Sequence, residues 1–149
     1  MNPHDYEQLL PATEDRLDYI RRLLKEQDLP TDDIEVQQDS LYVYTVDSTR
    51  IGVGGLECYE PVALLRSVAI ESSKQNEGYG HSLCRQLCKQ AAASGVTELY
   101  LLTTTADGFF ADLGFREIQR EDAPSTIQQT SEFRDLCPTT ASCMMKQLS

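Results

Sequence analysis

Two glycines open a segment whose backbone could bind an anion. The segment KQNEGYGH, residues 74–81, carries Gly78 and Gly80 just ahead of an apolar run with helical spacing. A glycine-rich turn that leads from a strand into a helix directs several backbone N–H groups at one point, where the positive end of the helix dipole adds to them. Because the backbone holds the anion, the side chain of Glu77 can face solvent. The turn therefore indicates a phosphate site, with an ordinary turn as the alternative.

The nucleotide-binding motifs that contain such turns are incomplete here. Leu83 stands at the place of the third glycine of the Rossmann fingerprint GxGxxG, and no Gly-Lys-Ser/Thr follows as in a P-loop. The pattern that remains is Gln75-x-x-Gly78-x-Gly80 after an apolar strand. The sequence therefore predicts that backbone N–H groups hold a pyrophosphate in some other fold.

A second residue with chemical potential is Arg66, which interrupts the otherwise mostly apolar segment VALLRSVAI, residues 62–70. A guanidinium inside a strand buried on both faces is very costly unless an anion pairs with it. Its partner is either an acidic side chain such as Glu57 or the carboxylate of a substrate, which a guanidinium can bind with two parallel hydrogen bonds. The residues alone leave both partners open.

Hydroxyl and carboxyl groups supply further candidates for ligand binding and for catalysis. Thr103, Thr104 and Thr105 end an apolar segment, and such a polar triplet suits the rim of a ligand site, although β-branched residues also simply suit strands. Glu57, on the strand beside residues 62–70, is a candidate general base, acting directly or through water. An exposed carboxylate without a catalytic role is the alternative.

A sheet with helices packed on it must position these residues. Segments 62–70 and 96–103 are apolar on both faces, which is typical of central strands, and a helix between them makes the pair parallel. The other expected strands are 6–10, 41–46, 51–59 and 141–148, with residues 115–120 between the later helices, and helices are expected after Thr13, after the glycine turn, at 107–113 and around 125–136. The fold class is α+β.

The composition favours one domain over residues 1–149 with neither a nucleic-acid nor a membrane surface. The net charge of −11 argues against the clustered Lys and Arg that such surfaces need. No apolar run approaches the length of a transmembrane helix, and the N-terminus MNPHDYEQLL lacks the features of a signal peptide. We therefore expect a cytoplasmic protein; a homodimer stays open.

The five cysteines are expected to be reduced thiols that pack as small apolar groups. Cys84 and Cys88 share a helix face, and Cys137 and Cys143 flank a short connection, yet neither pair has CxxC spacing or a neighbouring histidine. Structural zinc sites use such spacings to bring four ligands together. No metal is therefore expected.

Two motifs together resemble the Gcn5-related N-acetyltransferase (GNAT) superfamily. Its shared motif is an apolar strand, then Gln/Arg-x-x-Gly-x-Gly/Ala, then a helix, which VAIESSKQNEGYGHSLCRQL fits. The segment ADGFFADLGF is similar to the later helix of the family, which ends in a Leu-Gly-Phe turn. The resemblance covers about residues 41–148. It implies the GNAT fold, a mixed, mostly antiparallel central sheet with a splayed parallel strand pair and flanking helices, and acetyl-CoA as cosubstrate.

The resemblance also implies roles for the residues that match the motif. The backbone of Val68, Ala69 and Ile70 would meet the pantetheine of acetyl-CoA, and the N–H of Val68 would polarise the thioester carbonyl. Phe110, in the same acetyl-CoA site, stands where many members carry a tyrosine that acts as the acid. The CoA thiolate therefore either leaves unassisted or takes its proton from another group. The residues that would hold the pyrophosphate are Gln75, Asn76, Glu77, Gly78, Tyr79, Gly80 and His81.

A closer resemblance concerns the acceptor. The segment LYLLTTTADGFFADLGFREIQREDAP is similar to bacterial N-acetylglutamate synthases and their short relatives, which acetylate the α-amine of glutamate. LLRSVAI, LYLLTTTADGFFADLGF and LCP are also similar to acetyltransferases of arsenic-resistance operons, for which a glutamate-like arsenical is a plausible substrate. A small amino-acid-like amine is therefore implied, with Arg66 and the three threonines as substrate-binding residues. Two other classes stay open: a non-catalytic acyl-CoA-binding regulatory module, and a protein or peptide N-acetyltransferase.

Overall fold

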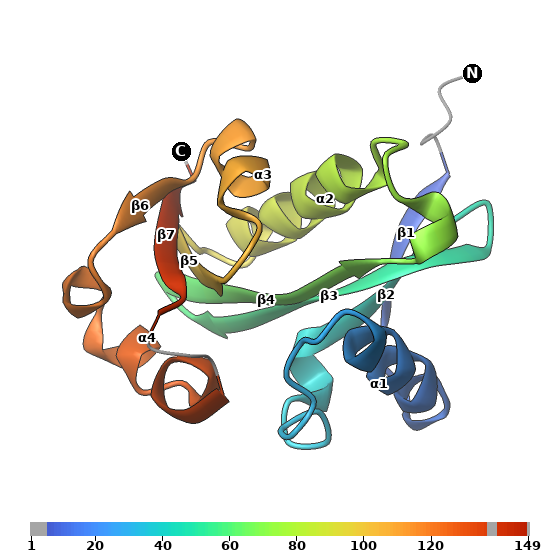
Figure 1. Cartoon of the computed structure of the whole chain (residues 1–149), viewed down its shortest axis with the longest axis horizontal. Coiled ribbons are helices and arrows are strands. Elements are labelled where there is room, and N and C mark those ends of the chain that lie inside the picture. Colours follow the sequence, from blue (N-terminus) through green and yellow to red (C-terminus); the bar gives the residue numbers. More distant parts are fainter. Residues whose placement is uncertain (1–5, 137–139, 149) are drawn as a thin grey trace. The chain divides into compact units, whose positions relative to one another are not determined.

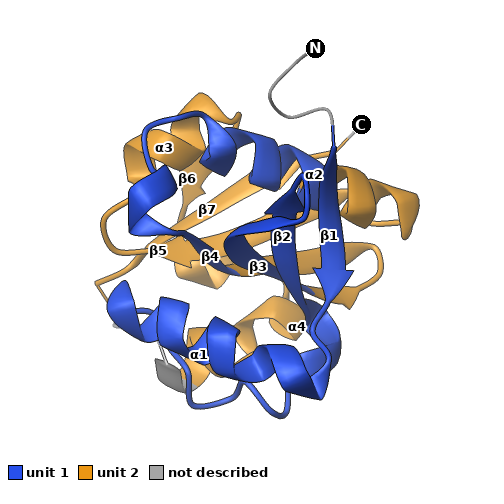
Figure 2. Ribbon diagram, turned by 90° about the vertical axis from the view of Figure 1, so that its right-hand side faces the viewer, with its two compact units in different colours: residues 1–56, 67–87 blue, residues 57–66, 88–149 orange. Residues whose placement is uncertain are grey.

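The computed structural model describes residues 6–136 and 140–148, and it confirms the α+β class and the mixed sheet. Within these residues seven strands form a sheet in the order β1-β2-β3-β4-β5-β7-β6 (Figure 1). The chain divides into two compact units, which Figure 2 distinguishes by colour. Unit 1 comprises residues 1–56 and 67–87, and unit 2 comprises residues 57–66 and 88–149, so that β3, β4 and α2 belong partly to each.

The strands predicted from the sequence are present, with ends that differ by a few residues. They are β1 Glu7–Pro11, β2 Leu41–Val46, β3 Thr49–Tyr59, β4 Val62–Ile70, β5 Glu98–Thr103, β6 Arg116–Ile118 and β7 Ser142–Gln147. The helices are α1 Leu17–Glu26, α2 Tyr79–Ala93, α3 Asp107–Asp112 and α4 Ser125–Gln128. Short 3₁₀ turns are η1 Glu14–Arg16, η2 Gln38–Ser40, η3 Ser72–Lys74 and η4 Arg120–Asp122, and η5 Glu132–Leu136 is a π-helical turn.

The single helix expected around residues 125–136 was wrong, since α4 ends at Gln128 and η5 begins only at Glu132. The buried Thr130 explains the break. Its hydroxyl donates to the carbonyl of Ile127 at 2.7 Å and accepts from the N–H of Phe133 at 3.5 Å. A threonine that bonds to the neighbouring backbone in this way competes with helical hydrogen bonds.

Unit 1 places one helix on each face of an antiparallel sheet. β1 pairs with β2 and β2 with β3, and the β2–β3 hairpin turns through two left-handed residues, Asp47 (φ 52°) and Ser48 (φ 67°). The helices α1 and α2 lie on opposite sides of these strands (Figure 1). Val53 packs in a core cluster with the apolar face of α1, whereas its neighbour Gly54 faces Leu87 of α2. Successive strand residues point to opposite faces. A Cβ at Gly54 would lie 2.7 Å from Cδ1 of Leu87, so the glycine lets α2 approach the sheet.

Unit 2 contains the one parallel strand pair of the sheet within the described residues. β4 pairs with β5 only from Val62–Glu98 to Leu64–Tyr100, although β4 continues to Ile70 and β5 to Thr103. The ladder therefore stops early, as expected for a splayed pair. β5 then pairs antiparallel with β7, and β7 with β6. One core cluster of this unit consists of Val62, Leu64, Tyr100, Ala123, Ile127, Phe133, Cys143 and Met145.

Two helices end at left-handed glycines. Gly95 (φ 89°) follows α2, and Gly114 (φ 97°) follows α3. Glycine adopts such φ values without the steric cost that a Cβ brings. These two positions therefore fix where the chain leaves each helix.

Replacing Gly95 by alanine should lower the free energy of unfolding by about 1–2 kcal/mol, because an L side chain at a left-handed φ is strained. Its Cβ would also lie 2.7 Å from Oε2 of Glu60. Gly108→Ala is the matched control, since nothing lies within 4 Å of its new Cβ and its φ is not left-handed. Urea unfolding measures the free energy of unfolding of both variants. Equal stabilities would contradict the strained, left-handed conformation of residue 95.

Candidate functional site

In unit 1 the glycine turn has the backbone geometry of an anion nest. β4 leads through η3 into the turn, and α2 begins at Tyr79. Asn76 (φ 66°) and Gly78 (φ 84°) are both left-handed and flank the exposed Glu77. Left-handed residues alternating with others direct successive N–H groups into one concavity. The first-turn N–H groups of α2 add to it, because they have no intrahelical acceptors.

Gln75 holds the turn against the end of β4. Its side-chain Nε2 donates to the carbonyl of Ile70 at 3.2 Å, and its backbone N–H donates to the carbonyl of Ser72 at 3.5 Å within η3. The N–H of Lys74 likewise donates to the carbonyl of Glu71 at 2.8 Å. The long amide side chain at position 75 therefore supports the turn, while its N–H is already engaged.

The other residues predicted for acetyl-CoA binding in unit 1 lie at the end of β4 and at the start of α2. Val68 is half-buried between buried neighbours, Ser67 and Ala69. Gly80 and His81 are both in the first turn of α2 and half-buried. Their contact with a ligand stays a prediction.

Ser67 is a feature that the sequence did not reveal. It is buried inside β4 and yet left-handed, with φ 58°. A left-handed residue other than glycine costs about 1–2 kcal/mol, and such strain gathers at functional sites. The only sequence indication was that Ser67 follows Arg66 in an otherwise apolar strand. The irregular backbone lies directly before Val68, whose N–H is the predicted oxyanion donor.

In unit 2 the guanidinium of Arg66 has two carboxylate partners. Its Nη1 lies 2.7 Å from Oε2 of Glu57, and its Nε lies 3.1 Å from Oε2 of Glu132. No part of the Arg66 side chain is exposed. The requirement for an anionic partner is thus met inside the protein, by Glu57 as one expected alternative and by Glu132 in addition. Whether Arg66 also binds a substrate carboxylate stays a prediction.

Glu57 is buried, although an exposed strand carboxylate was one interpretation of the sequence. It is 2% exposed, and its Oε1 accepts a hydrogen bond of 2.6 Å from the hydroxyl of Tyr59. Sequence reasoning missed Glu132, because it lies far along the chain in the π-helical turn η5. Such turns are frequent at functional sites. The four side chains form one network, which we call the Arg66 cluster: Glu57, Tyr59, Arg66 and Glu132.

The remaining predicted residues of unit 2 divide into buried and surface groups. Phe110 is buried, with its ring centroid 5.6 Å from that of Phe115 in an edge-to-face contact. Thr103 accepts a hydrogen bond of 3.0 Å from the N–H of Ala106, whereas Thr104 and Thr105 are exposed. A ligand could reach the last two hydroxyls without breaking a contact of Thr103.

Tyr100 is a poor candidate for the missing acid. Burial, together with the hydrogen bond of 2.9 Å from its hydroxyl to Oε1 of Glu98, raises the pKa of Tyr100 to about 12. A phenol with that pKa gives up its proton reluctantly at neutral pH.

The expectation that the cysteines pack as small apolar groups holds for the buried Cys84 and Cys143 and the half-buried Cys88. It was wrong for Cys58, which is exposed near the end of β3. Burial raises the pKa of Cys58 and Cys88, and it raises the pKa of Cys143 to about 11. Such thiols stay protonated and unreactive at neutral pH. Cys137 lies outside the described residues. In the described part of the chain, no His, Cys, Asp and Glu residues gather as a metal site, and no helix is long and apolar enough to span a membrane.

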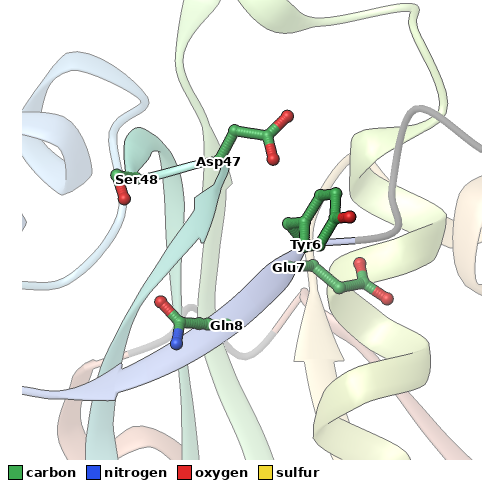
Figure 3. Close-up of a pocket in the computed structure, with 5 residues that line it drawn as sticks. All are labelled: Tyr6, Glu7, Gln8, Asp47 and Ser48. Atoms are coloured by element: carbon green, nitrogen blue, oxygen red, sulfur yellow. The ribbon is translucent and has the colours of Figure 1, made fainter.

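A polar pocket in unit 1 is lined by none of the residues predicted from the sequence. Figure 3 shows its lining, Tyr6, Glu7 and Gln8 at β1 and Asp47 and Ser48 at the β2–β3 turn. The carboxylate of Glu7 is already engaged by two side chains of this unit, the hydroxyl of Tyr44 and the amide of Gln86. We assign no ligand to this pocket.

Comparison with known proteins assigns the chain to a family. Residues 37–117 match the model of the acetyltransferase (GNAT) domain family. The matched segment is more than half of the chain and contains the glycine turn, Glu57, Arg66 and Phe110.

Individual relatives agree with this match. An amino-acid acetyltransferase from Aeromonas salmonicida is 29% identical over 98 residues, which are 64% of this chain but only 22% of that protein. N-acetylglutamate synthase from Neisseria gonorrhoeae, solved with coenzyme A and L-arginine, has a TM-score of 0.80 at 18% identity over 96% of this chain and 33% of its own. A Mycobacterium tuberculosis protein solved with CoA has a TM-score of 0.79 at 19% identity, over 95% of this chain and 99% of its own. These structures establish the fold that the sequence predicted.

Replacing Arg66 by alanine should lower the free energy of unfolding by about 3–5 kcal/mol, because Glu57 and Glu132 would stay buried without a cation. The exposed Arg116 on β6 provides a matched control, for which a change within about 0.5 kcal/mol is expected. Urea unfolding measures both. The triple variant Arg66→Met, Glu57→Gln, Glu132→Gln should be more stable than Arg66→Ala, and equal stability of wild type and Arg66→Ala would contradict the ion pairs.

Proposed function

Because the chain belongs to the GNAT acetyltransferase family, we propose that it transfers the acetyl group of acetyl-CoA to the primary amine of a small amino-acid-like molecule. The observation that carries this proposal is the glycine turn. Its left-handed Asn76 and Gly78 stand at the start of α2, where neutral N–H groups can hold the pyrophosphate of CoA. The CoA bound to two solved structures of this fold supports the same donor.

The proposed reaction is a direct attack of the amine on the thioester in a ternary complex. The N–H of Val68, next to the irregular Ser67, would stabilise the developing oxyanion, and Glu57 would accept the proton of the ammonium. Phe110 has no proton to give, so the CoA thiolate leaves without a tyrosine at that position.

For the acceptor we propose glutamate or a glutamate analogue, an arsenical amino acid among them. The similarity to amino-acid acetyltransferases and to N-acetylglutamate synthase supports it. The chain spans 22% of the length of the Aeromonas relative, so the substrate of that relative is only a guide. Thr103, Thr104, Thr105 and Arg66 would line the acceptor site. Because the Arg66 side chain is fully buried against Glu57 and Glu132, a substrate carboxylate would have to displace one of them from the guanidinium.

A non-catalytic acyl-CoA-binding module is the second candidate function. Phe110 at the place of a tyrosine acid is the observation that favours it. A role on protein or peptide amines, a cytoplasmic location and a homodimer also stay predictions.

Turnover with a panel of amines should distinguish these functions. We expect CoA thiol release from acetyl-CoA to accelerate with glutamate or a close analogue, including an arsenical one, more than with amino acids that lack a second acidic group. The acetylated amine is identified by mass spectrometry. CoA binding without turnover for any amine or basic peptide would favour the regulatory module instead.

The variant Gly78→Asp should abolish CoA binding, because it adds a carboxylate to the nest and strains a backbone with φ 84°. Glu77→Ala is the matched control, since it removes only an exposed side chain and leaves the backbone the same. Its CoA affinity should stay within a few-fold of wild type in calorimetric titration. Intact binding by Gly78→Asp, with native circular dichroism, would refute the phosphate assignment.

A further inference from the structure

We propose that Tyr59 and Glu57 form a proton relay that takes one proton from the acceptor ammonium, and that Glu132 keeps Arg66 neutralised while Glu57 is protonated. The inference rests on the proposed acetyl transfer and adds to it the group that meets the ammonium. Tyr59 becomes a catalytic residue, and Glu132 a positioning residue.

The geometry makes Tyr59 the exposed end of the Arg66 cluster. Glu57 and Tyr59 are two residues apart on β3, so both point to the same face of the strand. The Tyr59 hydroxyl donates to Oε1 of Glu57 at 2.6 Å. Tyr59 is 37% exposed, whereas Glu57, Arg66 and Glu132 are at most 4% exposed. Of the four side chains, Tyr59 is therefore the one that a ligand at the surface can contact.

The two ion pairs of Arg66 leave one counter-ion in place when the other carboxylate carries a proton. Glu57 and Glu132 both pair with the guanidinium of Arg66. Buried charge without a counter-charge is costly, so a proton on Glu57 requires that Glu132 still pairs with Arg66. If Arg66 paired with only one carboxylate, protonation of that carboxylate would leave the buried guanidinium without a counter-charge.

The surroundings decide which carboxylate takes the proton. Glu57 receives the Tyr59 hydroxyl, the route by which a proton arrives. Glu132 pairs with Nε of Arg66 at 3.1 Å from η5. Glu132 therefore remains the counter-ion, and Glu57 accepts the proton.

The proton transfers and the acetyl transfer conserve atoms and charge. The ammonium gives a proton to the Tyr59 oxygen as the hydroxyl proton of Tyr59 moves to Oε1 of Glu57. The amine lone pair then forms a bond to the acetyl carbon, and the C–S bond breaks as sulfur takes its electron pair. The second amine proton goes to the CoA thiolate, and Glu57 releases its proton to solvent through Tyr59.

The variant Tyr59→Phe tests the relay, because it removes the phenol oxygen and keeps the ring. At neutral pH we expect kcat with the best acceptor amine to fall about 100-fold, the scale of general base catalysis, while the KM for acetyl-CoA is unchanged. The loss should shrink as pH rises past the pKa of the amine, which then needs no base. Tyr100→Phe is the control, since its hydroxyl bonds to Glu98 outside the cluster and its activity should match wild type.

A double-mutant cycle gives the second measurement. Glu57→Gln should lose as much activity as Tyr59→Phe. The double variant should lose no more activity than either single variant, because the effects of groups that act as a unit do not add. A Tyr59→Phe enzyme with more than half of wild-type kcat, or a loss that is constant with pH, would overturn the relay and leave acetyl transfer intact. A wild-type protein that acetylates no amine would refute the proposed function and the relay together.

Discussion

The buried guanidinium of Arg66 sets the arrangement of unit 2. A charge with no exposed side-chain atom must be surrounded by counter-charges in a fixed geometry, since removing either partner leaves an unpaired ion in the core. Glu57 reaches it from β3 and Glu132 from η5, so one residue joins two strands and a distant turn. Apolar packing alone would tolerate many small shifts between these elements. The ion pairs tolerate fewer such shifts, so the buried charge favours one arrangement of these elements.

β4 combines this charge with a strained backbone at the next residue. A left-handed serine within a strand persists only where the surroundings over-determine its conformation. Arg66 supplies one anchor, and the buried apolar residues Ala69 and Ile70 supply another on the other side. The strand is thus held on both sides of Ser67. That arrangement gives a physical reason for a buried strand to carry two consecutive polar residues, which would otherwise only weaken it.

Local patterns in the sequence were enough to predict part of the fold and of the site. Periodicity located β4 and α2, because such patterns need only a few neighbouring residues. The left-handed Ser67 could not be predicted, since serine has no intrinsic preference for that conformation and only tertiary packing imposes it. Glu132 was missed for a related reason. Its partner lies far away in the sequence, and no local pattern distinguishes a buried carboxylate from an exposed one.

The net charge of −11 poses a question about the donor site, because CoA is itself an anion. Charges more than about 8 Å from a phosphate are largely screened at physiological ionic strength, so most of the acidic surface counts little. The local field decides the outcome, and there the turn uses neutral N–H groups and the dipole of α2. A glutamate side chain can stand at position 77 in such a nest, since the backbone holds the anion and the exposed carboxylate is solvated. Backbone recognition therefore lets an acidic protein select an anionic cosubstrate without a basic patch.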